Sequence, residues 1–139
     1  MVGTSSQPSR RPHRLVVRPC RYGREVIPEL DQHRITRWVE ARNAGLPDAA
    51  RDKIRYELDV TATTVTILEC RPPWRADYGP NWTRFPIARL RYTKTRRQWS
   101  LYWRDRNLRF HLYEPVPAGS SVEDLLAEVD RDPTGIFWG

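Results

Sequence analysis

Cysteine is scarce in this sequence, and nothing around it has the form of a metal site. The 139 residues include two cysteines, Cys20 and Cys70, and three histidines. Two cysteines without a secretion signal are typical of free thiols in a reducing compartment, so we expect a cytoplasmic protein. Their spacing to His13, His33 and His111 matches no zinc motif, and the sequence therefore predicts neither a metal nor a cofactor.

Long apolar segments are absent as well. The longest apolar run in residues 1–24 is Leu15-Val16-Val17, whereas a secretory signal needs about 7–15 apolar residues. No segment approaches the roughly 20 apolar residues that cross a bilayer. We therefore expect neither export nor a membrane partner.

Positive charge is abundant and unevenly placed. Lysine and arginine number 24 against 17 acidic residues, for a net charge of +7. Residues 1–24 contain six arginines and no acid, and residues 71–110 contain 11 basic and 2 acidic side chains. A cationic leader and a cationic central segment favour polyanions as ligands. Only two of the 24 basic residues are lysine, so an arginine-rich genome is the alternative explanation.

The length and the Ser-, Pro- and Arg-rich start predict two regions. We expect a disordered basic tail over residues 1–24 and a single domain over residues 25–139, because single domains commonly span roughly 100–150 residues. Pro28 suits the first turn of a helix that reaches about Ala44. The apolar stripe expected on this helix is Leu30, Ile35, Trp38 and Val39.

A second helix is expected near the C-terminus. Ser120 and Ser121 each have an acid three residues later, which is the capping-box arrangement. Pro133 would end this helix. Its buried stripe would be Val122, Leu125, Leu126 and Val129.

Five segments between these helices alternate apolar and polar side chains, which is the period of strands with one wet face. Short connections join the last three and favour antiparallel neighbours. The sequence therefore predicts an α+β domain, with a five-stranded, meander-like antiparallel sheet flanked by an N-terminal and a C-terminal helix. The helices could both cover the Trp99–Trp103 side of the sheet, or lie one on each side. The five segments are 54–60, 65–70, 87–92, 99–104 and 108–113.

Matching the apolar faces of the last three strands sets their expected register, because a one-residue slip would turn every side chain to the other face. The core rows would be Ala88–Trp103–Phe110 and Leu90–Leu101–Leu112. The opposite face would then gather Arg89, Arg91, Tyr102, Arg104, Arg109, His111 and Tyr113.

This polar face carries the main functional hypothesis, a non-enzymatic module that binds nucleic acid or another polyanion. Cross-strand neighbours lie about 5 Å apart, so its arginines need acids, a ligand or water between them. Rings among arginines on an open sheet suit single-stranded nucleic acid, because rings and guanidinium planes stack on bases while cations hold phosphates. In the alternative, Glu57, Asp59 or Glu69 neutralises the arginines, or a helix covers the face.

A protein-interaction adaptor is the second hypothesis. Trp74, Tyr78 and Trp82 lie in the Pro-rich loop 71–82. Trp, Tyr and Arg dominate binding hot spots, so this loop could anchor a partner. Packing at the edge of the core is the structural alternative for the same side chains.

An enzyme is the least favoured class. No hydrolase elbow, zincin or P-loop motif is present. A catalytic site would have to use Asp105, His111 and the arginines, yet the expected register keeps Asp105 and His111 too far apart for a hydrogen bond. The sequence therefore names no catalytic residue.

Three stretches of the chain resemble the bacterial domain-of-unknown-function 3024 family. They are Arg71-Pro72-Pro73-Trp74, the run from Trp99 to Asn107 and the run from Asp132 to Gly139. The resemblance extends from about Pro28 to the C-terminus and implies a bacterial, cytoplasmic setting. The family pattern has Arg in place of Cys70 and Gly in place of Leu108. The family has no established activity, so no catalytic residue carries over.

Overall fold

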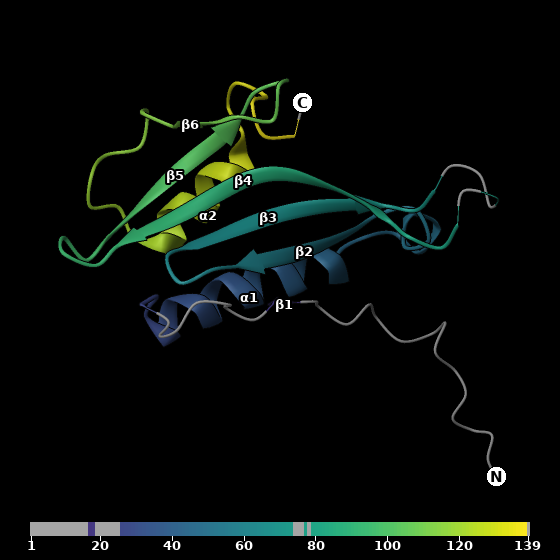
Figure 1. The fold of residues 1–139 in the computed structure, drawn as a ribbon, viewed down its shortest axis with the longest axis horizontal. Helices are drawn as coiled ribbons and strands as arrows, with labels where there is room; N and C mark the ends of the chain where they lie inside the picture. Colours follow the sequence, from purple (N-terminus) through teal and green to yellow (C-terminus); the bar gives the residue numbers. More distant parts are fainter. Residues whose placement is uncertain (1–16, 19–25, 74–76, 78, 139) are drawn as a thin grey trace, which may run out of the picture.

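The computed structural model describes residues 17–18, 26–73, 77 and 79–138, which form one sheet and two α-helices (Figure 1). Neither of the described α-helices has the length and the apolar character that spanning a bilayer requires. A 3₁₀ turn at Asp48–Ala50 follows the first helix. The other elements are β1 (Val17–Arg18), α1 (Glu29–Ala44), β2 (Arg55–Val60), β3 (Thr64–Arg71), β4 (Thr83–Thr93), β5 (Gln98–Arg104), β6 (Phe110–Leu112) and α2 (Val122–Arg131).

The strands lie in the sheet in the order in which they occur in the chain, from β1 to β6. Strands β2 to β6 pair antiparallel, which confirms the predicted five-stranded sheet of an α+β domain. β1 adds a parallel edge, because Val17 pairs with Leu58. The predicted tail did not include this pairing, and the rest of residues 1–24 lies outside the described residues.

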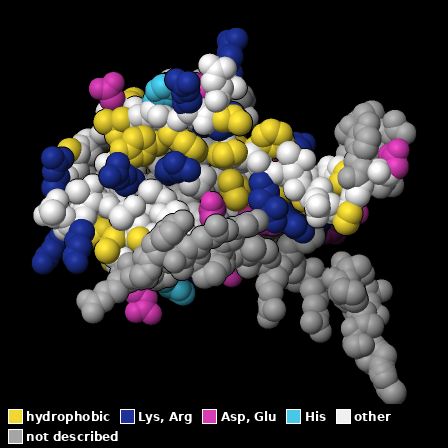
Figure 2. Space-filling model, in the orientation of Figure 1, with side chains coloured by type: hydrophobic (Ala, Val, Ile, Leu, Met, Phe, Trp, Pro, Cys, Tyr) yellow, Lys and Arg dark blue, Asp and Glu magenta, His cyan; other side chains and the backbone are white. Residues whose placement is uncertain are grey.

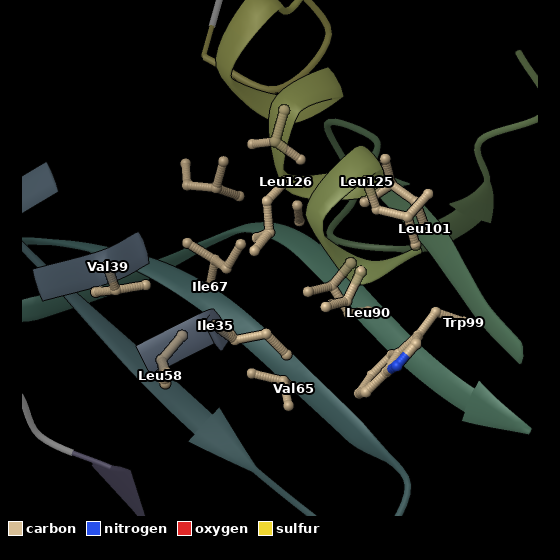
Figure 3. Close-up of a cluster of buried hydrophobic side chains, with 14 of the residues drawn as sticks. Ile35, Val39, Leu58, Val65, Ile67, Leu90, Trp99, Leu101, Leu125 and Leu126 are labelled. Carbon is tan, nitrogen blue, oxygen red and sulfur yellow. The ribbon is translucent and has the colours of Figure 1, made fainter. Parts of the chain in front are cut away.

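Both helices pack on one face of the sheet, and the core lies between them and the strands (Figure 3). Ile35 and Val39 of α1 are fully buried, as the sequence predicts. The prediction for Leu30 is wrong, because its side chain is 58% exposed. Leu30 precedes Ile35 by five residues, which turns it about 140° around the helix. The sheet face that packs against the helices contributes these buried strand residues to the core: Leu58, Val65, Ile67, Leu90 and Leu101.

Helix α2 begins where the capping pattern predicts. The hydroxyl of Ser121 accepts a hydrogen bond of 3.1 Å from the Asp124 N–H. The helix ends at Arg131, and the capping residue Asp132 takes a left-handed conformation with φ 42°. The Asp132 carboxylate then accepts the N–H groups of Phe137 and Trp138. These bonds hold the C-terminal aromatic residues against the core.

The register between β5 and β6 differs from the prediction by one residue. Trp103 pairs with His111, and Tyr102 pairs with Leu112. The expected register needs a two-residue loop after Asp105, whereas the observed loop has the additional residue Leu108, with φ 66°. A turn followed by one left-handed residue is a common three-residue hairpin loop, and it shifts the returning strand by one position.

This shift turns β6 over. The prediction that Phe110 and Leu112 lie in the core is wrong, because both lie on the face away from the helices and Leu112 is 51% exposed. The prediction that Tyr113 and His111 lie on the polar face is also wrong. Tyr113 is only 4% exposed and belongs to the core beside α2.

Candidate polyanion interface

The face of the sheet opposite the helices collects arginines and apolar side chains from three adjacent strands. Arg89 of β4 pairs with Tyr102 of β5, which pairs in turn with Leu112 of β6. Figure 2 shows apolar side chains of this face interleaved with basic ones. We call the following residues the open-face cluster: Arg89, Arg91, Tyr102, Arg104, Phe110 and Leu112.

Arg89 lies at the centre of this cluster. Its Nε donates a hydrogen bond of 2.9 Å to Thr66 Oγ1. Its guanidinium carbon lies 4.0 Å from the centroid of the Phe110 ring. Burial lowers the pKa of the guanidinium, and the Asp59 carboxylate opposes that shift. Arg89 is therefore a partly desolvated cation stacked on an aromatic ring, and an anionic ligand would stabilise its charge.

Arg104 and Arg91 flank this centre in different ways. The Nε of Arg104 donates to the carbonyl of Pro86 at 2.6 Å, and its Nη1 donates to the carbonyl of Asp105 at 3.1 Å. These bonds fix the side chain without neutralising it. Arg91 is exposed. The cluster thus combines two positioned guanidinium groups with that of Arg91, which forms no hydrogen bond or ion pair within the described residues.

No nearby acid lies within ion-pairing distance of these arginines in the described structure, although the Asp59 carboxylate favours the charged form of Arg89. Glu57 is buried and pairs with Arg55 at 3.0 Å and with Arg84 at 2.9 Å. Glu69 pairs with Arg71 at 3.0 Å. In the described part of the chain, no carboxylate forms an ion pair with any of the four arginines that the sequence singled out, Arg89, Arg91, Arg104 and Arg109.

Three predicted members of the site lie elsewhere. Tyr113 is buried, and its hydroxyl donates a hydrogen bond of 2.6 Å to Glu128. Burial and this bond raise the pKa of Tyr113 to about 12, so it is a neutral core residue and not a platform for bases. Arg109 is exposed in the loop before β6. His111 lies on the helix side of the sheet, where it stacks on Trp103 with ring centroids 4.7 Å apart.

Sequence reasoning missed the contribution of β6 to this face. Phe110 and Leu112 replace His111 and Tyr113 beside the arginines. The signal that could have revealed this is the run Asp-Arg-Asn-Leu-Arg, because Asp105 and Asn107 favour a turn. A left-handed position at Leu108 is not readable from a leucine, since bulky residues rarely adopt it.

Trp82 of the predicted partner-binding loop packs against a charged side chain of β2. The ring of Trp82 lies under the guanidinium of Arg55, 4.1 Å from centroid to carbon. Trp74 and Tyr78, predicted as partner anchors with Trp82, lie outside the described residues.

The Cys70 thiol is fully buried, and burial followed by the nearby Glu57 carboxylate raises its pKa to about 11. Such a thiol is a poor nucleophile at neutral pH.

Comparison with known proteins places the chain in one family. A family model described as "Domain of unknown function (DUF3024)" matches residues 24–139, and the chain belongs to this family, as the motifs indicated. No curated protein and no solved structure matches the chain. Among the described residues, no group of three or more His, Cys, Asp or Glu side chains could hold a metal ion.

Proposed function

We propose that this member of the DUF3024 family is a non-enzymatic module that binds nucleic acid, in single-stranded or structured form, through the open-face cluster. The observation that carries the proposal is a set of arginines that form no ion pair with any carboxylate of the described residues, beside the half-buried Tyr102 and Phe110 and the exposed Leu112. Phosphates would occupy the positions near Arg89, Arg91 and Arg104. Bases would stack on Tyr102 and on the face of the Phe110 ring that Arg89 leaves open, and they would make apolar contact with Leu112.

The chemistry of this face favours nucleic acid over a second copy of the chain. Two identical faces would bring their unpaired arginines together, and like charges at close range repel. A purely apolar partner would leave the same guanidinium groups desolvated without a counter-charge. A ligand with both negative charges and flat apolar surfaces satisfies both parts of the cluster.

We further propose a bacterial, cytoplasmic setting, which the family resemblance supports.

The test is fluorescence anisotropy of labelled single-stranded DNA, duplex DNA and RNA with the full chain. Arg91→Glu is the best single change, because Arg91 is exposed and its side chain forms no hydrogen bond within the described structure. We expect at least about a tenfold loss of affinity, since the change removes one phosphate contact and adds repulsion. Arg37→Glu, an equal charge reversal at an exposed position on α1, is the matched control and should change affinity less than about twofold.

Two further variants distinguish binding through the open-face cluster from binding through the arginines of residues 1–24. Replacing Arg10, Arg11 and Arg14 by Gln removes charge there and should leave the effect of Arg91→Glu unchanged. Tyr102→Ala should weaken binding to single strands by about 1–3 kcal/mol, the usual contribution of one stacked base. The proposal is wrong if the full chain binds none of the three nucleic acids, or if Arg91→Glu binds them as well as the wild-type chain does.

A further inference from the structure

The β4–β5 hairpin carries a second group of cations next to the open-face cluster. Thr93 pairs with Gln98 and closes a four-residue loop, 94–97. Three of its four side chains are basic, and all of them are exposed. We call Lys94, Arg96 and Arg97 the hairpin cluster.

The positive charge of this hairpin has no ion-pair partner among the acids of the described residues. The run from Arg89 to Arg97 contains five basic residues and no acidic one. No carboxylate of the described residues pairs with Lys94, Arg96 or Arg97. Figure 2 shows basic side chains at the end of the molecule where this hairpin lies. Neighbouring like charges repel, so the hairpin is a favourable place for a chain of negative charges.

The hairpin cluster continues the line of the open-face cluster. Arg89 and Arg91 point to the open face from alternate positions of β4, and Lys94 follows after Thr93. The aromatic and apolar members of the open-face cluster lie on the same face of the sheet but on the neighbouring strands β5 and β6. The surface is therefore divided into an end with charge alone and an end with charge and apolar side chains.

We propose that the hairpin cluster is a separate subsite for the phosphate backbone of a single-stranded nucleic acid whose neighbouring bases lie on Tyr102, Phe110 and Leu112. This inference rests on the proposed function. A single strand can turn its bases onto an open sheet while its backbone continues along the hairpin, whereas a duplex keeps its bases stacked inside. The division of the surface thus selects a single strand that extends beyond the stacked bases.

The experiment compares two double variants of the full chain that each remove one lysine and one arginine. Lys94→Gln with Arg96→Gln changes the hairpin cluster. Arg37→Gln with Lys53→Gln is the matched control, because both residues are exposed and lie outside the open face. The probe is a labelled 12-residue oligothymidylate, and anisotropy gives its affinity over a series of salt concentrations.

The hairpin variant should lower the slope of log affinity against log salt by about 1.4, because each lost phosphate contact on a single strand contributes about 0.7. The control variant should keep the wild-type slope. Circular dichroism should show equal melting temperatures for all three proteins, since the altered side chains are exposed.

Each alternative result has a definite meaning. If both double variants lower the slope equally, overall charge is responsible and the subsite is refuted. If neither lowers the slope while Arg91→Glu still weakens binding by at least about tenfold, the subsite is refuted and the proposed function stands. If the wild-type chain does not bind the oligonucleotide at any salt concentration, the subsite fails, and binding to duplex DNA or RNA then decides whether the proposed function survives.

Discussion

The Nε2 atom of His111 lies 2.6 Å from Oδ2 of Asp105, although the two residues are six positions apart in a hairpin. The other carboxylate oxygen of Asp105 accepts the N–H groups of Asn107 at 2.8 Å and Arg109 at 3.0 Å. One side chain therefore holds the loop and the returning strand together. The expectation that Asp105 and His111 are too far apart to form a hydrogen bond was wrong, because it assumed the expected β5–β6 register, which differs from the observed one by one residue.

The first prediction concerns acid stability at Asp105. Hydrogen bonds from His111 and then from the Arg109 N–H lower the pKa of Asp105 from 3.8 to about 2. The folded state favours the ionised form, so this contribution to stability is complete above pH 4 or so and is lost as the pH falls through about 2. Asp105→Asn should flatten the dependence of melting temperature on pH across this window. Unchanged slopes in thermal denaturation at stepped pH would contradict the assignment.

The second prediction concerns strain at Leu108. Its φ of 66° lies in the left-handed region, which costs an L-residue about 1–2 kcal/mol. Its side chain is 57% exposed, so little packing is lost on removal. Leu108→Gly should raise the free energy of unfolding in urea by about 0.5–1 kcal/mol. Leu112→Gly, at an exposed strand position, should instead lower it by a similar amount.

The third prediction concerns the buried pair of Tyr113 and Glu128. The Tyr113 bond, followed by that of Arg131, lowers the pKa of Glu128. Tyr113→Phe removes one of these donors from a buried carboxylate and should lower the free energy of unfolding by about 1–3 kcal/mol. Tyr102→Phe is the control, because the Tyr102 hydroxyl forms no hydrogen bond within the described residues. Equal losses in the two variants would show that the Glu128 bond adds no stability.

The fourth prediction concerns Arg42, which joins both helices, the sheet and the C-terminal segment. Its guanidinium carbon lies 3.8 Å from the Trp138 ring centroid and 5.2 Å from that of Tyr56. Its Nη1 atom pairs with the Asp130 carboxylate at 2.9 Å. Arg42→Ala should lower the free energy of unfolding by about 2–3 kcal/mol, because it removes stacking, charge and packed methylenes together.

Arg42→Lys tests how much of this effect depends on the planar group. Lysine keeps the charge but cannot stack as a plane, so it should restore less than half of the loss. Arg37→Ala, on the same helix, should change stability by less than about 0.5 kcal/mol. Full recovery in Arg42→Lys would show that charge alone accounts for the contribution of Arg42.

Much of the candidate site was readable from local sequence. Arg89 and Arg91 alternate with Leu90, and Tyr102 and Arg104 alternate with Leu101 and Trp103, so each strand assigns its own two faces. The pairing of Arg89 with Tyr102 was predicted correctly, because both faces of β4 and β5 have clear polarity and the strands are long. These four residues are the predicted site members that lie on the open face as expected.

Strand β6 could not be placed in the same way. It has only three residues, and both of its faces carry large side chains, so its pattern does not decide between two registers. The turn before β6 determines which register forms, because Leu108 takes a left-handed conformation and the Asp105 carboxylate accepts the N–H groups of Asn107 and Arg109. The same register places Tyr113 beside Leu101, whose carbonyl accepts the Tyr113 N–H, and there the Tyr113 hydroxyl donates to Glu128 of α2, 15 positions away.

The sequence by itself determined the helices, the order of the strands and the distribution of charge, because periodicity and capping depend on residues close together in the chain. The tertiary structure alone decided that both helices cover one face and that Glu57 pairs with Arg55 and Arg84. It also placed Phe110 beside Arg89. These outcomes depend on which distant groups meet, and the free energy of such contacts is not encoded in any local pattern.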